Sequence, residues 1–333
     1  MPLDLVIPDL LLAAGATARL AAARLPHAEK WLARAEIATE PGAGTLAWLA
    51  ATHGLTEPAP YAAVALAGEG REAAGAWLRA DPVHLRIDQD SVVLHDAAVL
   101  DLAREEAEAL AGALREHFAS DGLALEVVAP QRWYVRVPEG ELPTTVPLER
   151  AAGHNVFGLL PRGAGRINWP ALLTEAQMLL AQHPVNEARE PAKPAVNGVW
   201  FWGEGRLPEG VARRHALVYA REPFALGLAR LTGAEARDPP ASIAEVDLVR
   251  PGESALVVLD GLVATLRRGD EDAWLAAAQA LDERWFAGIE KAVARFGSVR
   301  IVLPAGEHVR VATVMPSARW RWFRARKPLA AHA

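Results

Sequence analysis

The segment from His183 to Arg189 ends in a side chain that could bind an anionic ligand. Arg189 carries a guanidinium, whose planar set of donors suits a phosphate group. The same guanidinium could instead pair with Glu187 or Glu190, which lie close to it in the sequence. His183 precedes a proline at an expected helix end. A favourable interaction with the helix dipole is sufficient to explain a histidine at this position. Arg189 is therefore the candidate ligand contact, and an ion pair is the alternative.

Two glycines follow the next hydrophobic run. Residues 199–202 read Val-Trp-Phe-Trp, which predicts a buried strand, and Gly203 and Gly205 permit a tight turn at its end. In an open α/β sheet, ligands bind outside the carboxyl ends of the strands. The pattern predicts either a ligand-binding turn or a packed strand followed by an ordinary turn.

The elements around these residues can be predicted from the sequence. Asn168 before Trp169 and Pro170 indicates a helix start, because a short polar side chain caps free N–H groups and proline fits the first turn. Strands and helices alternate after residue 215, which is typical of a mainly parallel sheet. The expected strands of the parallel sheet are 5–8, near the start of the chain, and 216–220, 255–259 and 299–303. The expected helices after residue 215 are 223–231 and 272–296.

Composition excludes several classes of protein and site. The chain has 333 residues, 51% of them hydrophobic, which is enough for a sizeable core and about two domains. It has no cysteine, so disulfides, thiolate metal sites and a cysteine nucleophile are excluded, and a cytoplasmic location is expected. A net charge of -6 argues against a general nucleic-acid surface, and no stretch approaches the ~20 apolar residues of a membrane span. The P-loop, zincin and serine-hydrolase motifs are absent.

The last residues, 319–333, form a basic aromatic tail. Arg319 and Arg321 alternate with Trp320 and Trp322, which suits an extended strand with a basic and an apolar face. We expect the tryptophans to pack on the core and the arginines to face an anionic partner. Nucleic acid is a minor alternative, because basic residues between aromatic ones are only a weak footprint of such binding.

His183-Pro-Val-Asn-Glu-Ala-Arg189, together with Asn197, Trp200 and the two glycines that follow, resembles a joint in archaeal-type cofactor-independent phosphoglycerate mutases. The chain is also similar to bacterial RpfE-type regulatory proteins. The resemblance implies an alkaline-phosphatase-like α/β core sheet made of residues 1–80 and 166–318, with a small α+β domain inserted at 81–165. Arg189 and Asn197 of this signature are expected to contact a ligand.

The same resemblance implies two divalent metals and a serine nucleophile. The nucleophile position falls on Ala43, with Thr45 as the nearest hydroxyl, so no catalytic residue is assigned. The first aspartate of the family's metal site matches Asp9, and the late Asp-His pair appears as Glu307 and His308. Asp9 could instead cap a helix, and His308 could be an ordinary loop residue.

Two arginines lie in the segment that matches the other metal-binding loop of the family. Where the family has Asp-x-x-Gly-His, this chain has Val263-Ala-Thr-Leu-Arg267, followed by Arg268. Cations at these positions could neutralise phosphate charge without a metal, or they could be a solvated pair at a loop tip. No cofactor is expected, except for one divalent manganese or magnesium ion held by Asp9, Glu307 and His308.

Three functional hypotheses follow. The first is a catalytically degenerate phosphoglycerate-mutase-like protein that regulates or senses phosphate esters, with a phosphorylated small molecule or a protein as its partner. The second is an active metal-dependent mutase or phosphatase. The third is a purely structural or interaction protein.

Overall fold

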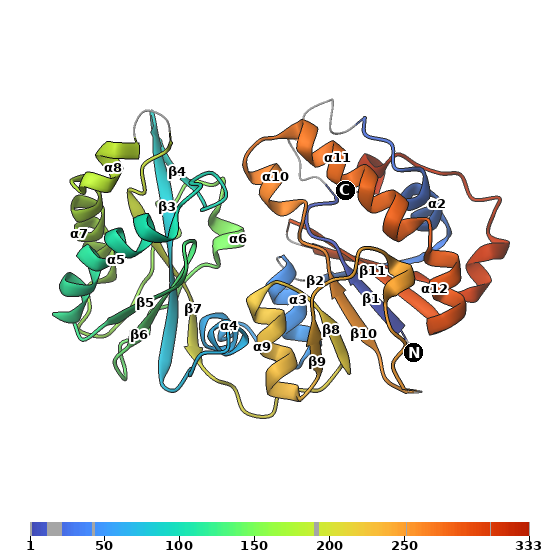
Figure 1. Cartoon of the computed structure of the whole chain (residues 1–333), viewed down its shortest axis with the longest axis horizontal. Coiled ribbons are helices and arrows are strands. Elements are labelled where there is room, and N and C mark those ends of the chain that lie inside the picture. Colours follow the sequence, from blue (N-terminus) through green and yellow to red (C-terminus); the bar gives the residue numbers. More distant parts are fainter. Residues whose placement is uncertain are drawn as a thin grey trace. The chain divides into compact units, whose positions relative to one another are not determined.

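A computed structural model of the chain describes residues 2–11, 22–41, 44–189, 193–250, 252–306 and 308–332. The chain divides into two compact units (Figure 1): unit 1 combines Met1–Leu55 with Val211–Ala333, and unit 2 is Thr56–Gly210. The chain thus leaves unit 1 once and returns once. Among the described residues, every helix falls short of the length and apolarity needed to cross a lipid bilayer.

Unit 1 is built on a sheet of seven strands within the described residues, in the order β2-β12-β11-β1-β10-β8-β9. All of these strands except β12 run in the same direction, because β12 is antiparallel to both of its neighbours. The sheet therefore has one edge at which almost all of its strands end. The strands are β1 Pro2–Val6, β2 Glu36–Pro41, β8 Leu217–Tyr219, β9 Glu235–Arg237, β10 Ala255–Val258, β11 Ser298–Ala305 and β12 His308–Val314.

Helices on both faces of this sheet complete unit 1 (Figure 1). Gly233 ends α9 in the left-handed conformation, with a φ of 68°, as its glycine predicts. The expected helix 272–296 is interrupted by a π-helical turn, Asp282–Phe286. The helices are α2 Pro26–Arg34, α3 Thr45–Thr52, α9 Pro223–Thr232, α10 Val263–Arg267, α11 Glu271–Leu281 and α12 Ile289–Phe296.

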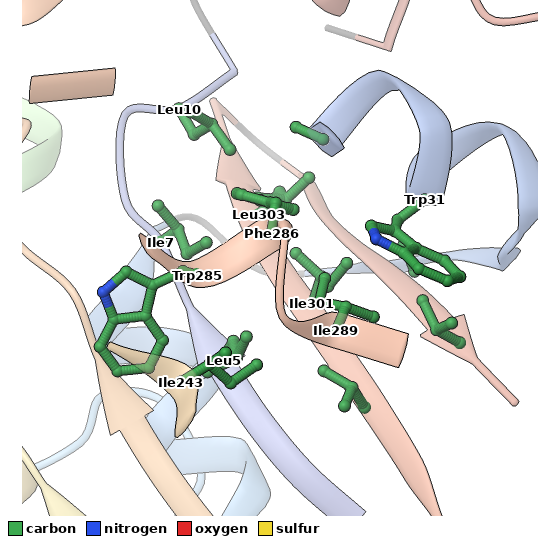
Figure 2. Packing of buried hydrophobic residues seen from close by; sticks show 14 of the residues in the cluster. Leu5, Ile7, Leu10, Trp31, Ile243, Trp285, Phe286, Ile289, Ile301 and Leu303 are labelled. Carbon is green, nitrogen blue, oxygen red and sulfur yellow. The ribbon is translucent and has the colours of Figure 1, made fainter. Parts of the chain in front are cut away.

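The π-helical turn joins the core of unit 1 to the start of α2. Phe286 is fully buried with Ile7 and Leu303 in the cluster shown in Figure 2. From the same turn, the carboxylate of Asp282 accepts hydrogen bonds from the backbone N–H groups of His27, at 3.1 Å, and Ala28, at 2.6 Å. The first N–H groups of a helix have no acceptor within that helix. The side chain of Asp282, which is distant in the sequence, therefore caps the N-terminus of α2.

Unit 2 contains an antiparallel sheet in which the long strand β3 pairs with three others. β3 pairs with β6 and β4 in the strand order β4-β3-β6-β5, and it also pairs with β7. The strands are β3 Ala76–Asp88, β4 Ser91–His95, β5 Ala124–Ala129, β6 Arg132–Val137 and β7 Gly198–Arg206. The helices are α4 Tyr61–Gly68, α5 Arg104–Ala119, α6 Leu148–Ala151, α7 Trp169–Ala181 and α8 Pro184–Arg189.

The placement of β7 corrects the expected division of the chain. β7 contains residues 199–202, which were expected in the core sheet, yet it lies antiparallel to β3. This pairing draws the segment up to Gly210 into unit 2, and α4, which contacts both β3 and β7, draws in the segment from Thr56. The expected inserted domain, 81–165, is therefore only the central part of unit 2.

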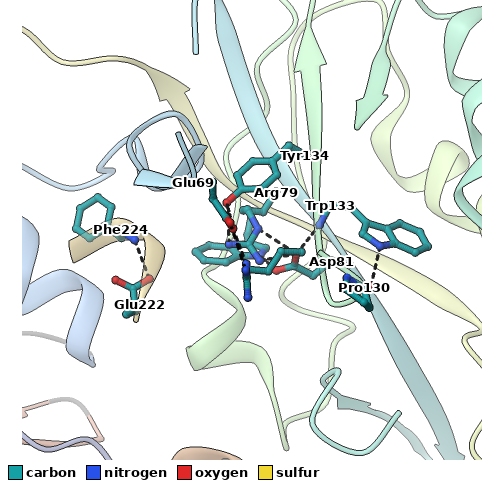
Figure 3. A network of polar contacts seen from close by, with 10 residues as sticks. Glu69, Arg79, Asp81, Pro130, Trp133, Tyr134, Glu222 and Phe224 are labelled. Carbon is teal, nitrogen blue, oxygen red and sulfur yellow. Dashed lines mark hydrogen bonds and ion pairs between the residues drawn. The ribbon is translucent and has the colours of Figure 1, made fainter. Parts of the chain in front are cut away.

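A buried polar network lies on one face of the unit 2 sheet (Figure 3). Asp81, 1% exposed, accepts hydrogen bonds from Arg79 Nη2 at 2.7 Å and from Trp202 Nε1 at 2.8 Å. The Arg79 guanidinium also lies over the rings of Tyr134 and Trp202, at 4.8 and 5.2 Å. Because side chains alternate along a strand, Leu78 and Ala80 point to the opposite face and join the apolar cluster there.

The tail of unit 1 reverses the expected arrangement of its side chains. Trp320, Trp322 and Phe323 are 66%, 72% and 71% exposed, so the expectation that the tryptophans pack on the core is wrong. Arg321 donates to the carbonyl of Arg34 and pairs with Glu36, and Arg324 donates to the carbonyl of Ala35. The arginines hold the tail because the carbonyls at the end of α2 attract cations.

Replacement of Asp81 by alanine should destabilise unit 2. The substitution leaves the Arg79 guanidinium buried without its carboxylate, and breaking such a pair costs about 3–5 kcal/mol. We expect faster hydrogen exchange in peptides from β3, β6 and β7. Replacement of the exposed Asp88 should leave that exchange unchanged, and unaltered protection in Asp81→Ala would contradict a stabilising role for the network.

Candidate functional site

The signature segment around α8 is held together by its own side chains. Asn186, 4% exposed, donates from Nδ2 to the carbonyls of Leu180, at 2.7 Å, and Val196, at 2.9 Å. Its Oδ1 accepts from the N–H of Val196 at 2.9 Å. One amide thus fastens the end of α7 to the segment that enters β7. This role explains the asparagine of the signature without a ligand.

Arg189 is also committed to contacts within unit 2. It is 3% exposed, and Nη1 donates to the carboxylate of Glu106 at 2.7 Å. Its Nε donates to the carbonyl of Pro194 at 3.1 Å, and Nη2 donates to the carbonyl of Leu100. The carboxylate that Arg189 contacts is that of Glu106 and not that of Glu187, and Glu190 lies outside the described residues. With all three nitrogens donating to protein acceptors, Arg189 has a structural role within unit 2.

Asn197 and the two glycines complete the joint. The amide of Asn197 bonds both backbone groups of Leu85, accepting at 2.6 Å and donating at 2.9 Å, so its side chain extends the ladder between β7 and β3. At Gly203 and Gly205 an added Cβ would lie 2.9 Å from Tyr61 Cβ and 2.4 Å from Pro60 Cβ. The glycines therefore allow α4 and the residue before it to approach β7. Of the two alternatives left open by the sequence, the packed strand and turn is correct.

The carboxyl edge of the seven-stranded sheet gathers the other candidate residues. β1 lies between β10 and β11, and the three strands are parallel, so the segments that follow them meet at one edge. Asp9 follows β1, Asp260 follows β10, and His308 begins β12 after the hairpin from β11. The ladder continues beyond the strands, because Leu259 donates to the carbonyl of Val6 at 2.9 Å. This edge is the candidate functional site.

The backbone of Asp9, at this edge, adopts an uncommon conformation. Its φ is 57°, in the left-handed region that aspartate tolerates better than most residues. The indole N–H of Trp274 donates to its carbonyl oxygen at 3.1 Å, and the residue is half-buried. Strained backbone of this kind is common at functional sites, which fits the expected role of Asp9 without assigning a ligand to it.

Asp260 is a candidate that the sequence analysis missed. Burial raises the pKa of its carboxyl above the usual range, and the cationic Arg221 acts in the opposite direction. A half-buried carboxylate directly after a central parallel strand is a common feature of functional sites. The sequence contains a signal for it, since Asp260-Gly261 ends the apolar run of β10, but the resemblance places the family's metal-binding loop on the residues that follow.

The remaining expected residues are distributed along this edge. Arg267 ends α10 and is half-buried, and Arg268 follows it and is exposed. His308 is exposed and pairs in register with Ala305 and Pro41. Ala43 and Glu307 lie outside the described residues.

The donors at this edge do not fit the family's metal centre. In the described part of the chain, no three histidine, aspartate or glutamate side chains are grouped so that they could hold a metal ion. A centre with two ions needs complete sets of such ligands. No catalytic step through a metal is therefore derived from these residues.

Comparison with known proteins places the fold. No protein-family profile matches the chain. The probable 2,3-bisphosphoglycerate-independent phosphoglycerate mutase of Geobacter sulfurreducens is 33% identical over 66 residues, which are 20% of this chain and 16% of that protein. Among solved structures, the PH0037 protein of Pyrococcus horikoshii has a TM-score of 0.51 and 14% identity, covering 94% of this chain and 87% of that one. A cofactor-independent phosphoglycerate mutase from Thermoplasma acidophilum has a TM-score of 0.46 and 17% identity, covering 95% and 90%.

The structural match covers most of the chain and concerns the fold, whereas the sequence match to a named enzyme covers only 66 residues. The likeness to the Pyrococcus protein shows a shared fold, and the expected α/β class is confirmed. The Geobacter match supports the resemblance to phosphoglycerate mutases over 66 residues, and this chain spans only about a sixth of that protein's length.

Replacement of Arg189 by methionine should destabilise unit 2 without affecting the carboxyl edge. We expect a loss of about 2–3 kcal/mol, less than for a fully buried pair because Glu106 keeps partial access to solvent. Hydrogen exchange should speed up in α5 and α8, while peptides at the ends of β1 and β10 keep their protection. Arg206→Met, which removes an exposed ion pair with Glu139, is the matched control.

Replacement of Asp260 by asparagine should stabilise unit 1 at pH 7. The folded-state pKa of this carboxyl is raised, so ionisation opposes folding above that pKa, and the penalty disappears when the carboxyl is protonated at low pH. The free energy of unfolding at pH 7 should rise by more than the ~0.5 kcal/mol that is typical of a surface substitution. The gain should shrink at pH 4, and the exposed Glu290→Gln should show neither effect. An equal gain at both pH values would contradict the argument.

Proposed function

We propose that this chain is a phosphoglycerate-mutase-like protein that binds a phosphate ester at the carboxyl edge of its core sheet and acts as a regulatory or sensing module. The observation that carries the proposal is the segment after β10. There α10 has the sequence Val-Ala-Thr-Leu-Arg, at the position where the resemblance implies a carboxylate and an imidazole. Valine and leucine have no side-chain atom that can bind a metal ion, and the positive charge of arginine repels a metal cation.

The cations of α10 support phosphate binding. Arg267 ends the helix and Arg268 follows it, at the edge to which ligands bind in open α/β sheets. Guanidinium groups match the geometry of phosphate oxygens and remain charged at any physiological pH. They can therefore take over the charge neutralisation that a metal ion gives in the family. A role of this kind agrees with the resemblance to RpfE-type regulatory proteins that the sequence suggests, and in this proposal a protein partner would receive the signal.

A second candidate function is an active metal-dependent mutase or phosphatase. Asp9 and Asp260 favour it, because they are carboxylates after adjacent parallel strands. Oxygen ligands of this type suit one manganese or magnesium ion, with His308 and Glu307 as the further donors expected from the sequence. When bound, such an ion would polarise a phosphoryl oxygen.

The two functions are separated by assays on the whole protein. Interconversion of 2-phosphoglycerate and 3-phosphoglycerate is measured with added manganese, beside a metal analysis of the purified chain. Calorimetry of 3-phosphoglycerate binding without metal then compares the wild type with an Arg267→Met, Arg268→Met double variant. Arg284→Met, at an exposed position of the same unit, is the control.

The proposal predicts turnover at background level and binding that weakens at least about tenfold in the double variant, equivalent to 1.4 kcal/mol. The control should bind like the wild type. Turnover that requires manganese and disappears in Asp9→Ala would overturn the proposal in favour of the active enzyme. Equal binding by the wild type and the double variant would also contradict it.

A further inference from the structure

A second cluster of charged residues lies at the opposite edge of the same sheet. The residues that begin β1, β8, β10 and β11 line a pocket of about 370 Å³, together with the end of α3. Its polar side chains include Asp4, His215, Ser254 and the two arginines Arg214 and Arg300. Because all four strands are parallel, these amino ends lie away from Asp9 and Asp260.

A buried carboxylate forms the floor of this pocket. Asp4 is 2% exposed, and Leu3 and Leu5 on either side of it point to the opposite face of the sheet and into the apolar core. Its Oδ2 lies 3.0 Å from Nε2 of His215, at hydrogen-bonding distance. Its Oδ1 forms an ion pair with Nε of Arg300 at 3.4 Å and has no hydrogen-bond partner among the described residues. Burial of a carboxylate costs several kcal/mol unless it is paired, so Asp4 holds His215 by a hydrogen bond and attracts Arg300.

The groups held by Asp4 keep unused hydrogen-bonding capacity. His215 is 2% exposed, and its Nδ1 is buried with no hydrogen-bond partner among the described residues. Buried polar atoms of folded proteins almost always have a partner, so this atom is an exception that needs an explanation. A ligand in the pocket that His215 lines would supply it.

The charges around the pocket leave a positive surplus. Arg300 is matched by Asp4, whereas Arg214 donates through Nε to the carbonyl of Thr52 at 3.0 Å and pairs with no carboxylate in the described part of the chain. The nearby carboxylate of Glu253 lies 3.9 Å from Arg213. His53, whose ring centre is 5.4 Å from that of His215, is uncharged at neutral pH because burial lowers its pKa to about 4.

We propose that the pocket between Arg214, His215 and Arg300 binds a small hydroxylated phosphate monoester through its phosphoryl group. This site is separate from the carboxyl edge and does not depend on the function proposed for it. Arg214 and Arg300 supply guanidinium donors to the phosphoryl oxygens. The volume of about 370 Å³ exceeds that of a phosphate ion and leaves room for a short carbon chain.

The hydroxyl of the ligand is specified by His215. Its Nε2 lies at hydrogen-bonding distance from Asp4, and when that nitrogen carries the proton of a neutral ring, Nδ1 accepts a hydrogen bond. A hydroxyl group next to the phosphate is the donor that such an acceptor requires. Glycerol 3-phosphate has both features, inorganic phosphate has only the anionic one, and glycerol has only the hydroxyls.

Calorimetry at low ionic strength tests the site with these three probes on the full-length Arg267→Met, Arg268→Met variant, which lacks the cations of the carboxyl edge. We expect glycerol 3-phosphate to bind more tightly than inorganic phosphate, and glycerol not to bind. Arg214→Met should weaken glycerol 3-phosphate binding at least about tenfold, whereas Arg213→Met, at the exposed neighbouring position, should change it less than twofold. Arg214 is exposed, and circular dichroism of Arg214→Met checks that loss of its hydrogen bond to the carbonyl of Thr52 leaves the fold unchanged.

A second readout locates the ligand. Titration with glycerol 3-phosphate should shift the NMR signals of the His215 imidazole and leave those of the exposed His154 unchanged. The Arg267→Met, Arg268→Met variant should bind this probe in the pocket like the wild type, which separates this site from the carboxyl edge. Absence of glycerol 3-phosphate binding, equal binding by Arg214→Met, or an unchanged His215 signal would overturn the proposal.

Discussion

The central position of β1 determines most of this structure. The first strand of the chain is completed only by β10 and β11, which follow much later in the sequence, because Leu3 pairs in register with Ala255 and Val299. The chain leaves unit 1 after Leu55 and returns to it at Val211 before β10 and β11 form. Two hydrogen bonds hold the departing and returning segments together, from Ala212 N–H to the carbonyl of His53 and from Arg214 Nε to the carbonyl of Thr52. Unit 2 can therefore be a continuous segment with its own sheet and core.

The same constraint gives unit 1 two chemically different edges. At the carboxyl edge, Asp9 follows β1, whereas Asp260 and the cations at the end of α10 follow β10, which is distant from β1 in the sequence. At the amino edge, Asp4 organises His215 and Arg300. The family signature belongs to neither edge, since Asn186, Arg189 and Asn197 use their polar atoms to join elements within unit 2. Residues that match a family signature can thus build the fold without lying at either edge of the core sheet.

Local rules made parts of the fold predictable from the sequence. Asn168 caps α7 by accepting from the N–H of Ala171, and Gly233 ends α9, because these effects depend on a few adjacent residues. The partner of β7 could not be predicted, since an apolar strand fits a parallel or an antiparallel sheet equally well. The tail shows the same limit. Alternation separated its arginines from its tryptophans, but the carbonyls at the end of α2 determined which of them face the protein.

The candidate site was predicted in part. Asp9 and His308 were expected at one edge, and the parallel arrangement of β1 and β11 places the strand ends that carry them there. Arg189 and Asn197 were assigned to a ligand because charge and sequence position do not reveal burial. Asp260 was missed because its significance depends on the neighbouring strand and on its enclosure, both of which come from the tertiary structure.

We propose that the carboxyl edge binds a phosphate ester through cations in place of a two-metal centre. Diffraction from crystals grown with manganese and 3-phosphoglycerate, recorded at the manganese absorption edge, tests this proposal most directly. We expect ester density beside Arg267 and Arg268, and anomalous density for at most one ion near Asp9. Two manganese ions bridged by the phosphate between Asp9 and Asp260 would contradict it.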